Sequence, residues 1–115
     1  MNWFVAKLIF EIKTQDSKSA QFDEQLRLIE AVNEELALEM AYQLGLMQQE
    51  EIINSNNRSV VWSFVAVTEI QKIGEIAHGK EIHYKITEPE QADEYLTFVR
   101  AKATHLKNRK SIYQE

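Results

Sequence analysis

The sequence predicts an α+β fold, a two-layer sandwich in which two helices cover one face of an antiparallel sheet of about five strands. Three observations support this prediction. Apolar and polar residues alternate in several short segments, two other segments repeat apolar residues at helical spacing, and the resulting order is β-β-α-β-β-β-α. In one small domain this order favours neighbouring strands that pair antiparallel, with both helices on the same side.

The first two strands are predicted at residues 3–12 and 22–31, separated by a polar loop. In the first strand every even position is apolar, which predicts one fully buried face: Phe4, Ala6, Leu8, Phe10 and Ile12. In the second, the alternation places Asp23, Gln25 and Arg27 opposite Phe22, Leu26 and Leu28. We expect these two strands to form an antiparallel hairpin.

A helix should follow, because Asn33 is a favourable N-cap and acidic residues occupy the next two positions. Its apolar residues recur at helical spacing and predict a core-facing stripe of Leu36, Met40, Leu44 and Met47. Gly45 is expected to end this helix.

Three further strands and a last helix complete the prediction. Residues 52–53 and 60–70 flank the polar turn 54–58, and the strongly apolar segment 60–68 is expected inside the sheet. Residues 81–87 alternate and predict a fifth strand. A capping box at 87–90 that contains Pro89 predicts the start of the second helix, and residues 108–115 are expected to fray. The apolar positions predicted as the core stripe of that helix are Tyr95, Leu96, Val99 and Leu106.

Composition limits the class of protein. The chain has 115 residues, of which 44% are hydrophobic and 27% charged, so we expect one domain over residues 1–115. It has no cysteine, which removes disulfides and thiolate chemistry. No apolar run is long enough to span a membrane, residues 3–12 do not resemble a signal peptide, and the cytoplasm is the default location.

The net charge of −5 argues against nucleic acid as a partner. The charge is uneven, since the last sixteen residues carry +4 and the rest −9. The basic segment has two interpretations. It either docks an acidic partner or places cations at the C-terminal end of a helix, where the helix dipole favours them.

Parts of the sequence resemble a family of small bacterial proteins grouped as domain of unknown function 4288. The resemblance covers roughly the first ninety residues, and the turn 54–58 departs from the family pattern because it lacks a glycine. The segments that carry the resemblance are Trp3–Lys7, Phe22–Leu28, Glu34–Glu35, Leu44–Gly45 and Val61–Phe64 with the following Glu69. The resemblance implies no catalytic residue, because members of the family are uncharacterised.

Sequence motifs for catalysis are weak. His78 and His83 have only a loose ligand spacing, and no serine lies in a nucleophile motif. The three glycines form no phosphate-binding loop. Glutamates on the sheet, such as Glu24 and Glu69, are either an acid–base pair or cross-strand partners of cations such as Lys7. We therefore predict no catalytic residue, cofactor or metal.

The second face of the sheet is the candidate interaction surface. If one side of the first strand packs on the helices, the other side mixes an aromatic residue with cations and amides, as interfaces do. The predicted face consists of Trp3, Lys7, Gln25, Arg27, Ser63, His83 and Lys85. The alternative is that Trp3 and Trp62 are shielded by loops of the chain itself.

Two functional hypotheses follow. The first is a non-catalytic module that binds a protein partner or a second copy, as in a homodimer, with an antidote or immunity-type protein as one specific version. The second is a small-molecule site or a weakly signalled enzyme with a polar site on the sheet.

Overall fold

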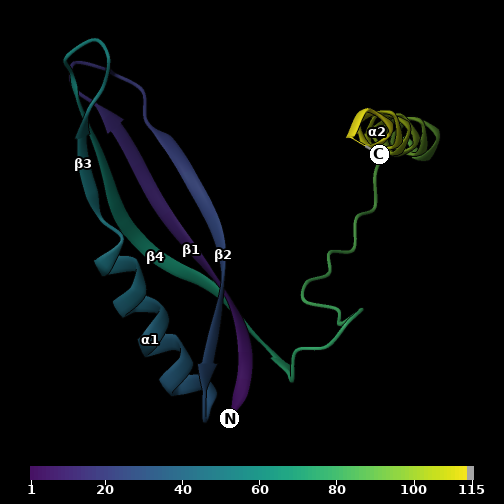
Figure 1. Cartoon of the computed structure of the whole chain (residues 1–115), viewed down its shortest axis with the longest axis horizontal. Coiled ribbons are helices and arrows are strands. Elements are labelled where there is room, and N and C mark those ends of the chain that lie inside the picture. The colour runs from purple at the N-terminus through teal and green to yellow at the C-terminus, as the bar shows by residue number, and fades with distance from the viewer. Residues whose placement is uncertain (114–115) are drawn as a thin grey trace. The chain divides into compact units, whose positions relative to one another are not determined.

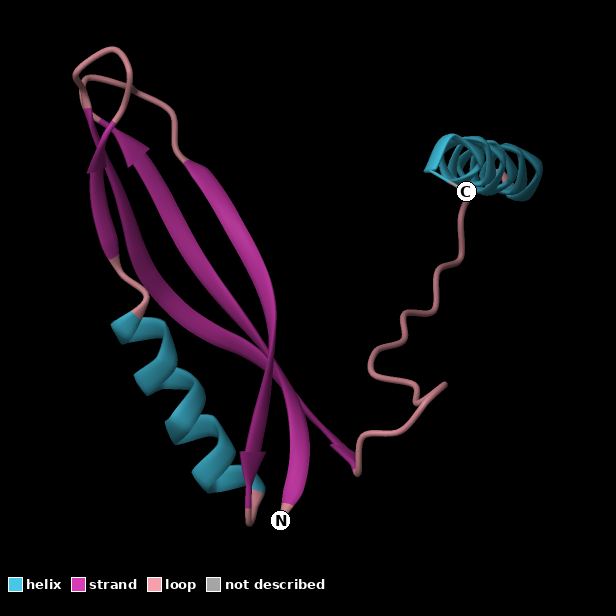
Figure 2. Ribbon diagram, viewed as in Figure 1, coloured by secondary structure: helices cyan, strands magenta, loops and turns pink. Residues whose placement is uncertain are grey.

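The computed structural model describes residues 1–113 and divides into two compact units, Met1–His83 and the segment from Tyr84 onward. We call the first the sheet unit and the second the helical unit, and each is described by itself. The α+β class is confirmed, with an antiparallel sheet and two helices (Figures 1 and 2). The elements are β1 (Asn2–Thr14), β2 (Gln21–Ala31), α1 (Glu34–Met47), β3 (Glu50–Ile53), β4 (Ser59–Gly74) and α2 (Ala92–Tyr113).

The sheet has four strands in the order β2-β1-β4-β3. The predicted β1–β2 hairpin is present, and its register runs from Asn2 opposite Ala31 to Ile12 opposite Gln21 without interruption. The apolar strand β4 lies inside the sheet as predicted, between β1 and β3. Its pairing with β1 contains three register shifts, whereas β3 pairs with only its first four residues.

The core lies between this sheet and α1. Phe4, Ala6, Leu8 and Phe10 on β1 are buried, which confirms the predicted buried face except at Ile12, which is only partly buried. From the other elements, Ile29, Ala31, Ala37 and Ala41 join the same cluster. Helix α1 therefore covers one face of the sheet, and we call the other the open face.

Local sequence explains both turns that flank α1 and β3. The Asn33 side chain accepts a hydrogen bond from the Leu36 amide at 2.8 Å, so Asn33 is the predicted N-cap. In the turn 54–58, Asn54 Oδ1 accepts from the amides of Asn56 and Arg58. Asn57 adopts a φ of 61°, so asparagine fills the left-handed position for which no glycine is present.

The predicted fifth strand is wrong. Residues 81–87 form no strand, and the apolar members of their alternation, Ile82, Tyr84 and Ile86, are 50%, 64% and 89% exposed. Alternation indicates a strand only where one set of side chains is buried against a neighbour, and this segment lacks such burial. The chain leaves the sheet at Gly74, which has a φ of 73°.

Both predicted helix boundaries near glycine and proline are also wrong. Helix α1 continues through Gly45 to Met47, and α2 begins at Ala92 rather than at Pro89. The first α2 backbone bond joins the Tyr95 amide to the Gln91 carbonyl. The fraying expected at 108–115 is not seen through Tyr113, since α2 includes these residues, and the last two lie outside the described part of the chain.

The core role predicted for the α2 stripe is not observed within its own unit. Tyr95, Leu96, Val99 and Leu106 are 40–46% exposed. A helix of 22 residues with few neighbours in its unit has no second element against which to bury an apolar stripe. The prediction that this helix shares the sheet face covered by α1 stays a prediction, as does the single domain.

Candidate interaction surface

Helix α1 contacts the sheet through its smallest residues. Ala37, Ala41 and Gly45 are its buried positions, spaced by four and therefore aligned along one side of the helix. At Gly45 the ring of Phe64 lies so close that a Cβ atom would overlap its Cε1, Cδ1 and Cζ atoms. Phe64 also packs edge-on against Tyr42 and tilted against Phe10, which fixes the position of the ring. The glycine thus permits close approach of helix and sheet.

This close approach displaces the larger apolar residues of α1 from the core. Leu36 and Met40 are about two-fifths exposed and Met47 is 78% exposed, whereas Leu44 alone of the predicted stripe packs against the core. The predicted core role of the stripe is therefore wrong for three of its four members. Helix α1 thus has two stripes at helical spacing. The stripe of small residues faces the sheet, and the stripe of large apolar residues is left mostly exposed.

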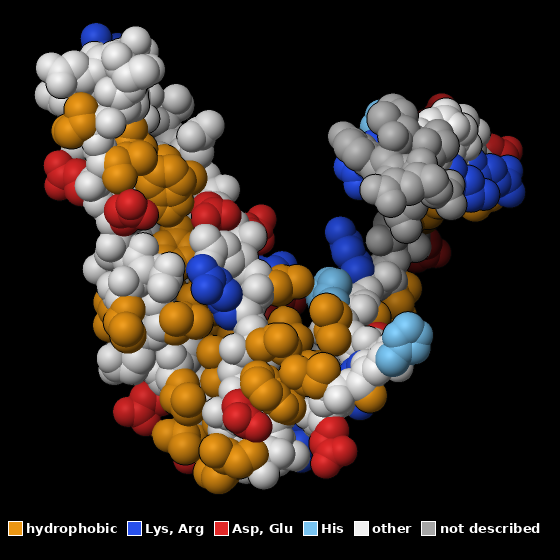
Figure 3. Space-filling model, in the orientation of Figure 1, with side chains coloured by type: hydrophobic (Ala, Val, Ile, Leu, Met, Phe, Trp, Pro, Cys, Tyr) orange, Lys and Arg blue, Asp and Glu red, His pale blue; other side chains and the backbone are white. Residues whose placement is uncertain are grey.

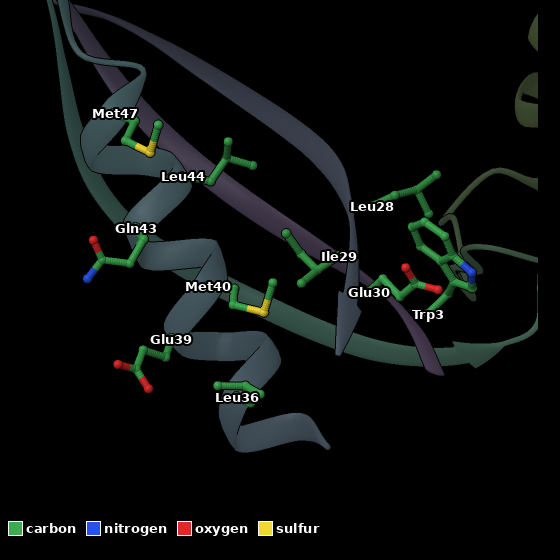
Figure 4. A pocket seen from close by; sticks show the side chains of 10 residues that line it. All are labelled: Trp3, Leu28, Ile29, Glu30, Leu36, Glu39, Met40, Gln43, Leu44 and Met47. Atoms are coloured by element: carbon green, nitrogen blue, oxygen red, sulfur yellow. The ribbon is translucent and has the colours of Figure 1, made fainter. Parts of the chain in front are cut away.

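The displaced residues line a pocket of about 660 Å³ between α1 and the adjoining ends of β1 and β2. We call it the α1–β2 groove. Figure 4 shows Ile29 on the same side of β2 as the α1 side chains, and Trp3, Leu28 and Glu30 on the other side of that edge strand, so the lining includes residues from both faces of the sheet. Its lining is Trp3, Leu28, Ile29, Glu30, Leu36, Glu39, Met40, Gln43, Leu44 and Met47. Figure 3 shows how apolar side chains, in orange, gather on the surface of the sheet unit.

The charged residues that line this groove are the two carboxylates Glu30 and Glu39. Glu34 and Glu35 lie in the first turn of the same helix, where the helix dipole favours negative charge. The groove therefore combines a mainly apolar lining with two carboxylates, which would favour an apolar ligand that also carries positive charge.

The predicted interaction face is only partly assembled. The even-numbered residues of β1 face α1, so its odd-numbered residues Trp3 and Lys7 lie on the open face. Ser63 lies there too, because it is paired with Glu11 of β1. Gln25 and Arg27 lie opposite Leu8 and Ala6, which places them on the α1 side of the sheet. The face on which a β2 residue lies depends on which β1 residue it is paired with. The alternation within β2 gives two sets of side chains but does not say which set faces α1.

Trp62 and the remaining predicted residues also depart from that face. Trp62 lies opposite Ile12 and packs against the core, so Trp3 and Trp62 occupy opposite faces of the sheet. His83 is exposed in the segment after β4, and Lys85 belongs to the helical unit. Of the seven residues predicted for one face, the structure therefore places only Trp3, Lys7 and Ser63 together on the open face.

Lys7 forms the one ion-pair network on the described part of the open face. Its Nζ lies 2.7 Å from Glu69 on β4 and 3.7 Å from Glu24 on β2. The hydrogen bond to Lys7 lowers the pKa of Glu69, and the charges of Lys7 and His83 act in the same direction. The same hydrogen bond raises the pKa of Lys7. These glutamates are cross-strand partners of a cation, one of the two roles considered for them.

Part of the open face is shielded by the chain itself. Residues 76–82, including Ile76 and Ile82, line a second pocket of about 190 Å³ with Val5, Leu26 and Leu28. The alternative considered for Trp3 and Trp62 was shielding by a loop of the chain. In the structure the segment after β4 lies beside Val5, Leu26 and Leu28 instead. Leu26 and Leu28 nevertheless remain about half exposed.

The α1–β2 groove was missed because the apolar α1 residues that line it were assigned to the core. A second repeat of small residues at 37, 41 and 45 was the available signal, since small residues allow the closest approach between a helix and a neighbouring element.

Among residues 1–113 the structure positions no group of three or more His, Asp or Glu side chains for a metal ion. No described helix is long and apolar enough to cross a membrane.

These features define a small α+β domain, in which one helix packs on a four-stranded antiparallel sheet and leaves an apolar groove beside the edge strand. The chain belongs to the family described as a domain of unknown function (DUF4288), whose model matches residues 3–84. The match coincides with the sheet unit and leaves α2 outside, as the resemblance implied. No curated protein and no solved structure matches the chain at a significant level.

Proposed function

We propose that this protein is a non-catalytic interaction module that binds an apolar, positively charged segment of a partner protein in the α1–β2 groove. The observation that carries the proposal is the exposure of Leu36, Met40 and Met47 on a helix whose small residues make the core contact. Exposed apolar side chains gathered around one hollow are typical of binding sites.

The chemistry of the groove fits a peptide segment. Methionine is flexible and polarisable, so Met40 and Met47 can adapt to different apolar side chains. An amphipathic segment would bury its apolar side against them and place a cation near Glu30 or Glu39. A narrower form of the proposal is an antidote or immunity-type protein, which the net charge of −5 would suit if the neutralised partner is basic. The proposal takes the protein to be bacterial and to act in the cytoplasm.

A small apolar molecule is the second candidate, because the groove volume of about 660 Å³ falls in the usual range of ligand pockets. This ligand would occupy the groove rather than the polar cluster around Lys7 that a sheet-based site would use. The two candidates share a location and differ in the ligand.

The test is selection of peptides from a random displayed library on the immobilised full chain, followed by titration of the selected peptides. We expect peptides with apolar residues flanked by Lys or Arg. Met40→Lys should weaken their binding at least about tenfold, because it puts a charge in the apolar groove. Leu38→Lys is the matched control, since Leu38 is similarly exposed on α1 but does not line the groove.

If both substitutions weaken peptide binding equally, or if neither weakens it, binding in the groove is contradicted. Thermal unfolding of both variants shows whether the fold is intact. Nile red, a neutral apolar dye, tests the second candidate. Dye binding that Met40→Lys abolishes, combined with no selected peptide, would favour a small molecule over a protein partner.

A further inference from the structure

The outer edge of β2 is a second surface, which shares Leu28 and Ile29 with the groove. β2 ends the strand order β2-β1-β4-β3, and within residues 1–113 it pairs with β1 alone. An edge strand presents unpaired amides and carbonyls that can bind another strand. Proteins usually protect such edges with proline, a bulge, a short strand or charged side chains. Of these, β2 has only charged side chains, because its 11 residues contain no proline and no register shift.

The side chains of this edge are partly apolar and exposed. Phe22, Leu26 and Leu28 project from the open face of β2 and are 62%, 49% and 51% exposed. On the α1 side of the same strand, Arg27 donates two hydrogen bonds to Gln25 Oε1, and Gln25 Nε2 donates to Asp23 at 2.6 Å. This row of three polar side chains is held in place along the edge.

We propose that two copies of this chain pair through the outer edges of their β2 strands, antiparallel and centred on Gln25, so that their four-stranded sheets form one continuous sheet. In this register Asp23 of each copy lies opposite Arg27 of the other, Phe22 lies opposite Leu28, and Glu24 lies opposite Leu26. Each pair occurs twice because the arrangement is two-fold symmetric. Opposite charges and apolar pairs directly across a strand pair both stabilise it.

The neighbouring registers are less favourable. Centring on Glu24 sets two Glu24 carboxylates against each other, and centring on Arg27 sets two guanidinium groups together and Glu24 against Glu30. Centring on Leu26 sets two carboxylates against apolar residues, Glu30 against Phe22 and Glu24 against Leu28, and it loses the Asp23–Arg27 pairs. Like charges directly opposite each other destabilise a strand pair. The charges of β2 thus select the register centred on Gln25.

The two-fold axis stands perpendicular to the sheet, so both α1 helices lie on the same face of the joined sheet. The strands run in opposite directions, which places these helices toward opposite ends of the β2 seam. The seam uses the backbone of β2 and residues 21–29, of which Leu28 and Ile29 also line the groove. The α1 residues of the groove lie outside the seam, so substitutions on α1 separate groove binding from dimerisation.

Sedimentation velocity of the full chain from about 1 to 500 µM tests the proposal, a range that covers the micromolar affinities of modest interfaces. We expect a reversible monomer–dimer equilibrium. Asp23→Arg or Arg27→Asp alone should raise the dissociation constant at least about tenfold, because each creates two like-charge pairs across the seam. The double variant Asp23→Arg, Arg27→Asp restores both opposite-charge pairs and should return the constant to within about threefold of the original.

A chain that stays monomeric throughout, single variants that dimerise as tightly as the original, or a double variant as weak as the singles would each overturn the proposal. Far-UV circular dichroism confirms that the variants are folded. Glu39→Arg separates the two surfaces, since Glu39 lines the groove and is not on β2. It should leave the dimer unchanged and weaken binding of a cationic peptide.

Discussion

Gly45 makes a sharp test of how α1 meets the sheet. Replacing it with alanine adds one methyl group, whose carbon would lie 2.6 Å from Phe64 Cζ and closer still to Cε1 and Cδ1. Real Cβ atoms do not approach carbon so closely. The Phe64 ring must therefore move, and its contacts with Phe10 and Tyr42 restrict where it can go.

Two opposing terms set the size of the effect. Alanine favours a helix over glycine by about 1 kcal/mol at an unstrained site. Overpacking of a filled site costs about 1–3 kcal/mol, and disturbing the aromatic pairs of Phe64 adds about 0.5–1.5 kcal/mol for each pair lost. We expect the unfavourable terms to exceed the helix gain, so that Gly45→Ala lowers the free energy of unfolding by about 2 kcal/mol.

Urea unfolding followed by circular dichroism measures this difference. The second arm of the experiment uses Phe64→Val, which retains a residue suited to a strand and removes all three ring atoms near Gly45. In that background Gly45→Ala should stabilise the protein by up to about 1 kcal/mol, because only the helix term remains. Stabilisation by Gly45→Ala in the original background, or the same effect in both backgrounds, would refute the proposed contact.

Two further predictions concern the N-cap and the ion pairs. Asn33→Ala should lower the free energy of unfolding by about 1 kcal/mol in urea, because the Leu36 amide loses its side-chain acceptor, whereas Asn33→Asp should retain most of the stability. The second prediction concerns Lys7, which lowers the pKa of Glu69, so the folded state favours the carboxylate. The stabilisation of the folded state by the Glu69 carboxylate is fully present above the unfolded-state pKa of Glu69. It is lost as pH falls through the lower folded-state pKa. Unfolding measured between about pH 7 and pH 3 should therefore show a smaller loss of stability for Lys7→Met than for the original chain. Parallel loss in both proteins would exclude the linkage.

The sequence was sufficient where local chemistry decides the structure. The even positions of β1 from Phe4 to Phe10 are apolar and buried, and the Asn33 cap starts α1 at the predicted residue. Such features depend on residues close in the chain. Residues 81–87 show the limit, because their alternation has the period of a strand but the structure gives it no pairing partner.

The candidate surface required information that one segment does not contain. Arg27 and Gln25 moved to the α1 side because the β1–β2 register places them opposite Ala6 and Leu8. On α1, both the large and the small stripes have helical spacing, and only the ring of Phe64, nineteen positions beyond Gly45, decides which one faces the sheet. Both stripes of α1 are equally regular in the sequence, so packing against a distant segment decides which of them is buried.

The pairing of β1 with β4 has a consequence for synthesis of the chain. Trp3 lies opposite Gly74, so the first and last strands of the family domain are neighbours in the sheet. A growing chain releases β1 and β2 from the ribosome before β4 emerges, and domains generally fold as units. Until β4 emerges, the nascent hairpin carries an open edge along β1 and an apolar face without its full cover. Unpaired edges and exposed apolar surface of this kind make a folding intermediate prone to aggregation.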